Sequence, residues 1–227
     1  MRVAAVIFDM DGLMVDTEPL YQRAWQQAAS ALGHELNDEL YETFVGRPTE
    51  ACEKLLMAEL GAAFPLARFR EQWPVLWRSE VARVGVQPKP GLFDLLSFVE
   101  GQRLPAAVAT SSEAEYADLT LSHAGLAHRF SVIVSGDQVA RGKPEPDIYL
   151  EAARRLDVRP ADCVAFEDSE AGIRAVQRAG MTGLLVPESQ PSAAAVHAAF
   201  RVVATLHEAR DVLASLIAQE RAAGNTA

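Results

Sequence analysis

Short apolar runs recur along the chain, and each is followed by a stretch with helical periodicity. The runs are Val3–Phe8, Leu104–Ala109, Val132–Val134, Cys163–Phe166, Gly183–Val186 and, less clearly, Val202–Leu206. Runs this short, bounded by Gly, Pro, Ser and Asp, are typical of strands buried on both faces of a sheet. Their alternation with helices predicts an α/β fold, a doubly wound parallel sheet with right-handed crossovers.

The alternation breaks between the first two runs. The segment from Gly12 to Arg103 holds several helical patterns and no clear strand, although a simple crossover needs far fewer residues. Two apolar stripes with helical spacing lie in this segment: Trp25, Ala28, Ala29 and Leu32, and then Leu66, Phe69, Trp73, Leu76, Trp77, Val81 and Val84. We therefore expect residues 16–87 to form an inserted, all-helical domain and residues 1–15 and 88–227 to form the α/β core.

The two ends of the insertion have the composition of hinges. The return linker "GVQPKPG" (Gly85–Gly91) contains prolines and glycines that favour a stiff, extended connection. Thr17 and Pro19 predict the start of the first inserted helix. We expect Asp16–Thr17 and Gln87–Pro90 to pair as hinge strands, so that the insertion closes over a bound ligand and opens to release it.

The net charge of the chain limits the classes of binding partner that we expect. The 227 residues are 49% hydrophobic, which is enough for a substantial core, and their formal net charge is −10. An acidic chain without a concentrated basic patch argues against nucleic acid and anionic membranes as partners. No apolar stretch approaches the ~18 residues of a membrane span, and no basic leader precedes the first run. We expect a cytoplasmic monomer or weak homodimer that binds a small molecule.

Cysteine and histidine offer no framework for a disulfide or a metal site. Cys52 and Cys163 lie far apart without a C-x-x-C partner, so we expect two free, buried thiols. The five histidines show no H-x-x-x-H or related spacing, and we expect them at surface or capping positions.

Polar side chains follow four of the apolar runs, at the point where each strand is expected to end. They are Asp9 and Asp11, then Thr110, Ser111 and Ser112, then Ser135, Gly136, Asp137 and Lys143, and finally Glu167, Asp168 and Ser169. Ligands of an open parallel sheet bind beyond the carboxyl ends of its strands. We therefore expect these side chains to line one crevice.

Four carboxylates in one crevice repel each other unless a cation lies among them. Oxygen ligands without His or Cys favour a hard ion, and Mg²⁺ accepts carboxylates together with water and phosphate oxygens. Hydroxyl groups, amides at a helix start and a lysine would complete a phosphate site. The set therefore predicts phosphoryl transfer.

Four motifs occur in a fixed order: "FDMDG", "ATSS", "GKPEPDIY" and "FEDSEAGIRAVQRAG". With these motifs, roughly residues 3–187 resemble the haloacid dehalogenase superfamily of phosphotransferases, in the branch of small sugar-phosphate phosphatases and β-phosphoglucomutases. Each motif is short, but the set is specific. The resemblance implies a helical cap inserted after the first motif, where the alternation of strands and helices breaks.

The resemblance also implies roles for the first two motifs. Asp9 is the expected nucleophile, which takes the phosphoryl group as an aspartyl-phosphate. Asp11 is the expected general acid and base, with its backbone carbonyl as a metal contact. Thr110, Ser111 and Ser112 are expected to hold the substrate through its phosphate. A Ser/Thr cluster here would also cap the helix predicted at "EAEYADLTL".

The last two motifs are expected to supply the cation site. Lys143 is one of three lysines beside 18 arginines, and we expect it to neutralise the nucleophile and the phosphate. Asp168 is the expected direct metal ligand, while Glu167 either ligates the metal or supports its ligands. The helix that follows has structural signals: Ser169 as its cap, Gly172 for close approach and Gly180 as its stop.

The insertion contributes weaker candidates for substrate contact. Arg47, in "VGRPTEA", is expected to reach the substrate, although a solvated surface position fits it equally well. Tyr21 is a second candidate substrate contact. Trp73 and Trp77 are expected in the core of the insertion rather than in a stacking platform for a sugar.

We expect a Mg²⁺-dependent phosphatase acting on a small phosphorylated metabolite, with sugar phosphates as the favoured class. The alternative is a β-phosphoglucomutase, which typically has a histidine where this chain has Tyr21 and a lysine late in the cap, where this chain has none between Lys54 and Lys89. A phosphonatase would need Lys54 for a Schiff base. Asp11 argues against a dehalogenase, and the intact motifs argue against a non-catalytic binding module.

Overall fold

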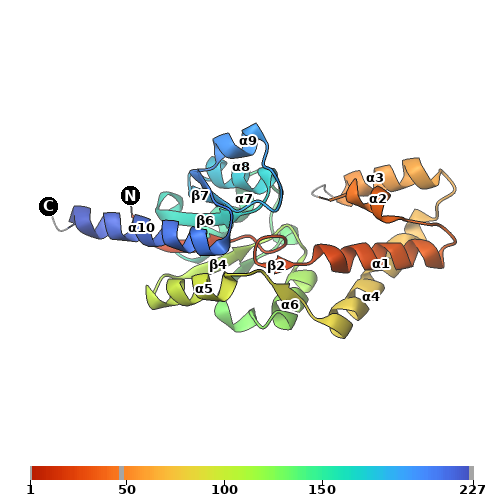
Figure 1. Ribbon diagram of the computed structural model, residues 1–227, viewed down its shortest axis with the longest axis horizontal. Helices are drawn as coiled ribbons and strands as arrows, with labels where there is room; N and C mark the ends of the chain where they lie inside the picture. The colour runs from red at the N-terminus through yellow and green to blue at the C-terminus, as the bar shows by residue number, and fades with distance from the viewer. Residues whose placement is uncertain (1, 46–48, 225–227) are drawn as a thin grey trace. The chain divides into compact units, whose positions relative to one another are not determined.

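The computed structural model describes residues 2–45 and 49–224, which divide into two compact units (Figure 1). The first unit contains the chain up to Asp16 and from Gln87 onward. The second unit is Thr17–Val86. Each unit has its own hydrophobic core.

Among the described residues, six strands form one sheet in the order β5-β4-β1-β6-β7-β8, and all neighbours are parallel. The strands are β1 Ala5–Phe8, β4 Ala106–Ala109, β5 Val132–Val134, β6 Cys163–Glu167, β7 Thr182–Leu185 and β8 Arg201–Val202. The predicted doubly wound parallel sheet is confirmed. The weakest predicted run differs most, because Leu206 already begins the last helix and only Val202 of Val202–Leu206 belongs to a strand.

Helices cover both faces of the sheet, because the crossovers run in opposite directions from its centre. On one side lie α5 Leu92–Gly101, α6 Ala114–His123 and α10 Leu206–Gly224, and on the other α7 Asp147–Arg155, α8 Glu170–Arg178 and α9 Ala193–Ala198 (Figure 1). Three short 3₁₀ turns complete this unit, at Ala127–Arg129, Gly136–Gln138 and Pro160–Asp162.

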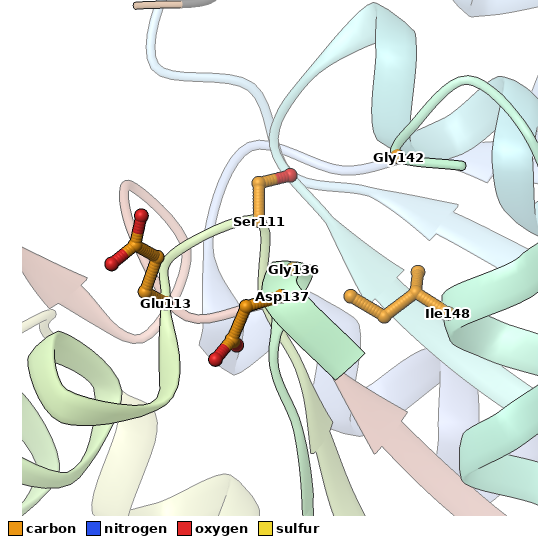
Figure 2. A pocket seen from close by; sticks show the side chains of 6 residues that line it. All are labelled: Ser111, Glu113, Gly136, Asp137, Gly142 and Ile148. Atoms are coloured by element: carbon orange, nitrogen blue, oxygen red, sulfur yellow. The ribbon is translucent and has the colours of Figure 1, made fainter. Parts of the chain in front are cut away.

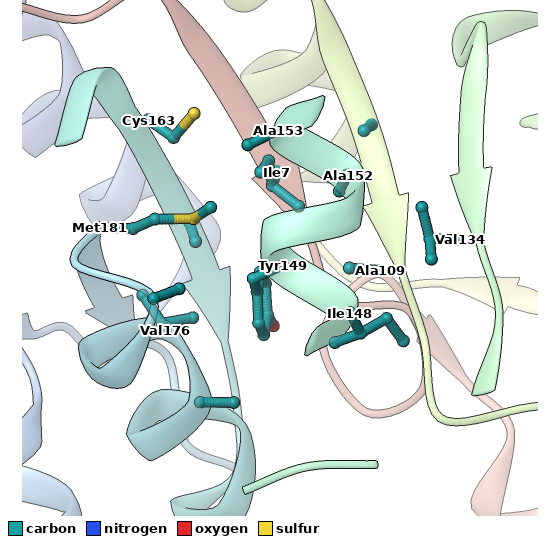
Figure 3. Packing of buried hydrophobic residues seen from close by; sticks show 14 of the residues in the cluster. Ile7, Ala109, Val134, Ile148, Tyr149, Ala152, Ala153, Cys163, Val176 and Met181 are labelled. Atoms are coloured by element: carbon teal, nitrogen blue, oxygen red, sulfur yellow. The ribbon is translucent and has the colours of Figure 1, made fainter. Parts of the chain in front are cut away.

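The alternation of side chains along the central strands sets which face each residue joins. Ala5 and Ile7 of β1 pack in the core cluster under α7 and α8 (Figure 3). Phe8 faces the other way, where its ring stacks on that of Phe166 at 5.1 Å. Asp9 lies two residues beyond Ile7, so the same alternation directs its side chain toward α7.

In the described part of the second unit, every regular element is a helix: α1 Glu18–Ala31, α2 Asp38–Glu42, α3 Thr49–Leu60 and α4 Leu66–Val84. Its core is aromatic, and the rings of Trp25 and Phe69 meet edge to face at 5.1 Å. Trp77 is fully buried, which confirms its expected place in the core. Helix α4 continues through Pro74, which has no N–H to donate within the helix.

The insertion is joined to the sheet unit by a short antiparallel pair of strands, β2 Val15–Asp16 and β3 Gln87–Pro88. Val15 pairs with Pro88 and Asp16 with Gln87, so the strand on the first side begins one residue earlier than expected. Thr17 is not in the strand, because it already occupies the N-cap position of α1 with helical backbone angles.

Candidate active site

The site begins where the two central strands end. Asp9 follows β1, and Glu167 is the last residue of the neighbouring strand β6. The backbone N–H of Asp9 donates to the carbonyl oxygen of Phe166 at 3.0 Å, so the register of the strands places the two carboxylates side by side. From β1 the chain turns toward β4, whereas from β6 it turns toward β7, and such a switch point is the usual ligand crevice.

Lys143 joins these two carboxylates. It lies in the loop between β5 and α7, and its Nζ donates to Oδ1 of Asp9 and, at 2.6 Å, to Oε1 of Glu167. The Lys143 side chain is only 6% exposed, so the interaction is little screened by water. The loop is held from α8, because Arg178 donates to the carbonyl oxygen of Pro144 at 3.0 Å.

Glu167 is fully buried, and both its oxygens accept hydrogen bonds. Oε1 accepts from Lys143 and from the Tyr149 hydroxyl at 2.6 Å. Oε2 accepts from the N–H groups of Asp168 and Ser169 and from the Ser169 hydroxyl at 3.0 Å. Ser169 also caps α8, as expected, by accepting from the Gly172 N–H at 3.1 Å.

Two glycines make room for the acidic groups. A Cβ on Gly172 would collide with the Glu167 carboxylate, which explains the close approach of α8. A Cβ on Gly12 would collide with Oδ2 of Asp168, and Gly12 also has φ +83°, a left-handed conformation that favours glycine. The loop after β1 therefore passes directly beside Asp168.

The carboxylates of Asp9, Glu167 and Asp168 can place one oxygen each within 4.8 Å of one another. With one ammonium, that of Lys143, these three carboxylates keep two formal negative charges, which matches one divalent cation. Asp11 is outside this group of described carboxylates. An oxygen-only donor set with this charge fits a hard divalent ion.

The pKa values of the three carboxyl groups reflect how closely they are packed. Burial, and then the charges of Glu167 and Asp168, raise the pKa of Asp9 well above its usual range despite Lys143. Burial and the Glu167 charge raise the pKa of Asp168 to about 8. Burial also opposes ionisation of Glu167, but Lys143 and the hydrogen bonds outweigh it and lower the pKa of Glu167. A cation between them would favour the ionised forms of Asp9 and Asp168 and so lower the pKa of both groups.

Asp11 is oriented by the second motif. Its Oδ2 accepts from the hydroxyls of Thr110 at 3.2 Å and Ser112 at 2.8 Å.

The expected capping of the next helix by the Ser/Thr cluster is wrong. Helix α6 begins at Ala114, too far along the chain from Thr110, and the N–H of Ala114 donates instead to Oδ1 of Asp137 at 3.1 Å.

Ser111 differs from its two neighbours. It lines a pocket of about 290 Å³ together with Glu113, Gly136, Asp137, Gly142 and Ile148 (Figure 2). Gly136 has no space for a side chain, because a Cβ there would meet the carbonyl oxygen of Ser111. The pocket thus adjoins the loop that carries Thr110 and Ser112.

Two of the predicted substrate contacts, Arg47 and Tyr21, belong to the helical unit. Arg47 lies outside the described residues. The Tyr21 ring stacks on that of Trp77 at 5.3 Å, within the helical unit. Sequence reasoning missed Tyr149, although its place in "GKPEPDIY", six residues after Lys143, could have drawn attention to it.

A family model described as haloacid dehalogenase-like hydrolase matches residues 6–186. A fructose-1-phosphate phosphatase of Escherichia coli is 39% identical over 79% of this chain and 94% of its own. A phosphorylated carbohydrates phosphatase of Thermotoga maritima is 38% identical over 78% and 82%.

A beta-phosphoglucomutase of Bacillus subtilis is 33% identical over 82% of this chain and 84% of its own. Among solved structures, CbbY of Rhodobacter sphaeroides in complex with phosphate has a TM-score of 0.76 and 28% identity, over 91% of this chain and 96% of that one. None of the helices in residues 2–45 and 49–224 combines the length and apolarity that a bilayer crossing requires.

Proposed function

Because the chain belongs to the haloacid dehalogenase-like hydrolases, we propose that it is a phosphatase that hydrolyses a small phosphorylated metabolite, with sugar phosphates as the substrate class. The observation that carries the proposal is the buried Lys143 ammonium shared by Asp9 and Glu167, next to an Asp11 carboxylate held by two hydroxyls. Two carboxylates in different surroundings suit two different roles in one reaction.

Asp9 is the proposed nucleophile. Its carboxylate oxygen forms a bond to phosphorus while the bond from phosphorus to the sugar oxygen breaks, which leaves an aspartyl-phosphate and the free alcohol. Lys143 offsets the negative charge of both Asp9 and the incoming phosphate, so that two anions can approach. Of the second motif, Ser111 is the proposed donor to phosphate oxygens, because the hydroxyls of Thr110 and Ser112 donate to Asp11.

Asp11 is the proposed acid and base. It protonates the leaving alcohol oxygen in the first step and takes a proton from the attacking water in the second, which releases phosphate and restores Asp9. The hydroxyls of Thr110 and Ser112 both donate to the same oxygen of Asp11. These two hydrogen bonds fix the orientation of the Asp11 carboxylate for the proton transfer.

We propose Mg²⁺ as the cation. Asp9 and Asp168, with the backbone carbonyl of Asp11, would hold it, and Glu167 lies in the same acidic group with both oxygens engaged by donors. When bound, the ion neutralises charge on the phosphate and on the nucleophile. The raised pKa values of Asp9 and Asp168 support a cation there.

We propose that the helical unit, Thr17–Val86, acts as a cap over the reaction. The hinge strands β2 and β3 are only two residues long each, which supports movement about them. Arg47 and Tyr21 remain the proposed substrate contacts from the cap.

The second candidate is a β-phosphoglucomutase, and the similarity to the B. subtilis enzyme favours it. The absence of a lysine between Lys54 and Lys89 and the presence of Tyr21 favour the phosphatase.

The decisive experiment is a phosphate-release screen over sugar phosphates and other metabolite phosphates with Mg²⁺. It includes β-glucose 1-phosphate with a glucose 6-phosphate readout. Release of phosphate from one or more sugar monophosphates is expected. Isomerisation that outpaces phosphate release would establish the mutase instead, and no turnover of any ester would exclude both.

A further inference from the structure

Tyr149 is a fully buried tyrosine whose hydroxyl group donates a hydrogen bond to a carboxylate of the candidate active site. It projects from the first turn of α7 into the core cluster, with the hydroxyl oxygen at the tip of the ring (Figure 3). The hydroxyl donates to Oε1 of Glu167 at 2.6 Å. That oxygen also accepts from Lys143, so the tyrosine and the lysine share one acceptor.

The ring of Tyr149 makes a second contact. The Nζ of Lys143 lies 5.2 Å from the ring centroid, within the range of a cation–π interaction. The ammonium therefore has the ring beside it and the carboxylates of Glu167 and Asp9 as acceptors. Since Lys143 has rotatable bonds along its whole side chain, these contacts decide where its charge lies.

We propose that Tyr149 is a positioning residue, which fixes Glu167 through its hydroxyl and Lys143 through its ring and thereby aims the ammonium at Asp9. The inference rests on the proposed function for its effect on catalysis, but the position of Lys143 can be measured without turnover. The Tyr149 hydroxyl donates to Glu167 rather than to Asp9, and in this scheme Tyr149 does not touch the substrate.

The variant Tyr149→Phe removes the hydroxyl and keeps the ring. A hydrogen bond to a charged group of this kind is worth roughly a factor of ten in rate where the charge acts in catalysis. We expect kcat to fall by roughly fivefold to tenfold while KM for the phosphate ester stays within about twofold, because the lost group faces Glu167 and not the substrate.

A double-mutant cycle tests the route of the effect. In a Glu167→Gln background, Tyr149→Phe is expected to change kcat by less than about twofold, because the hydroxyl acts through the Glu167 carboxylate. An equal loss in both backgrounds, or no loss in wild type, would overturn the inference.

Competitive labelling with acetic anhydride gives a readout that needs no turnover. The chain has three lysines, so Lys54 and Lys89 serve as internal references for Lys143. In Tyr149→Phe we expect labelling of Lys143 to rise at least threefold relative to the two references. Unchanged labelling would contradict the positioning role even if the protein proved to have no phosphatase activity.

The matched control is Thr120→Val. Thr120 is a fully buried residue of α6 in the same unit, and its hydroxyl has no hydrogen-bond partner among the described residues. Loss of this hydroxyl should leave kcat and Lys143 labelling as in wild type. If Thr120→Val reproduced the changes seen in Tyr149→Phe, they would reflect general loosening of the core, and the inference would fall.

Discussion

At the scale of single residues, two opposing electrostatic effects act on the Asp9 carboxylate. Burial penalises charge on Asp9, while the shared ammonium of Lys143 stabilises it. Burial disfavours the charged form of Lys143, but the negative charges of Asp9 and then Glu167 outweigh it and raise the pKa of the Lys143 ammonium. Asp9, the proposed nucleophile, therefore belongs to a network of three side chains, and the loss of one affects the other two.

The change Asp9→Asn should abolish turnover while the fold is retained. The amide is no nucleophile toward phosphorus, and such losses are normally several orders of magnitude. Phosphate release and far-ultraviolet circular dichroism would be compared with Asp118→Asn, an exposed aspartate on α6 that should behave as wild type. More than about 1% residual activity would contradict nucleophilic catalysis by Asp9.

Much of this residue list follows from position in the sequence. Asp9, Lys143 and Glu167 were expected together because each follows a predicted strand, and the ends of parallel strands meet at one edge. The directions in which side chains point were harder to predict from the sequence. The hydroxyls of Thr110 and Ser112 turn to Asp11, while Ser111 lines the pocket that also contains Asp137. Such directions depend on how a loop packs, which a local pattern does not encode.

At the scale of elements, helix α8 shows how packing serves the site. Ser169 and Gly180 set its two ends, as the sequence predicted, and Gly180 has the positive φ of +71° that a helix stop favours. Its first turn lies against the Glu167 carboxylate, because Gly172 has no side chain. The N–H groups of Asp168 and Ser169, immediately before the helix, donate to the same carboxylate.

The change Gly172→Ala should impair catalysis. The new Cβ has no space beside Glu167, and this carboxylate must shift away from Lys143 or Ser169. We expect kcat to fall at least tenfold, with the melting temperature also lowered by overpacking. The control is Gly101→Ala at the end of α5, where nothing lies within 4 Å of the new Cβ. Normal kcat in Gly172→Ala would show that the close approach has no catalytic importance.

Helices α1 and α4 of the second unit are joined by a polar cluster. The Glu80 carboxylate accepts from Arg23 at 3.0 Å, Gln27 at 3.2 Å and Arg83 at 2.7 Å. The Arg83 hydrogen bond is the largest cause that lowers the pKa of Glu80 to about 2. The ionised Glu80 carboxylate therefore stabilises the folded state at pH values above the pKa that Glu80 has in the unfolded chain. This stabilisation is lost as the pH falls toward 2.

The change Glu80→Gln should destabilise the helical unit by about 1–2 kcal/mol at pH 7, because charged hydrogen bonds are replaced by neutral ones. Urea unfolding would measure the difference against Glu71→Gln, an exposed glutamate on the same helix. The difference between Glu80→Gln and wild type should shrink toward pH 2, since wild-type Glu80 is then protonated. A difference independent of pH would exclude a charge effect.

At the scale of the whole molecule, cation binding is expected to be coupled to stability. Without metal, Asp168 keeps its proton in the folded state to about pH 8 but loses it near pH 4 when unfolded. The folded state therefore binds more protons between these values, and the free energy of unfolding falls as the pH rises through this window. Asp9 acts in the same direction.

Mg²⁺ should therefore raise the melting temperature more at pH 8 than at pH 5, because fewer protons compete for the carboxylates. At a hundredfold excess over its dissociation constant, the ion would add about 2.7 kcal/mol. Differential scanning fluorimetry with and without Mg²⁺ at both pH values measures the shift in melting temperature.

EDTA should also stop phosphate release reversibly. Equal shifts at both pH values, or full activity in EDTA, would contradict the cation site.

The sequence by itself determined the sheet, the helical insertion and the gathering of acidic residues at one edge. Periodicity and turn residues are local, and parallel topology brings strand ends together without further information. Tertiary structure alone decided that Lys143 also donates to Glu167 and that Tyr149 holds Glu167 from α7. Those contacts depend on strand register and on helix packing over the core, which many distant side chains set jointly.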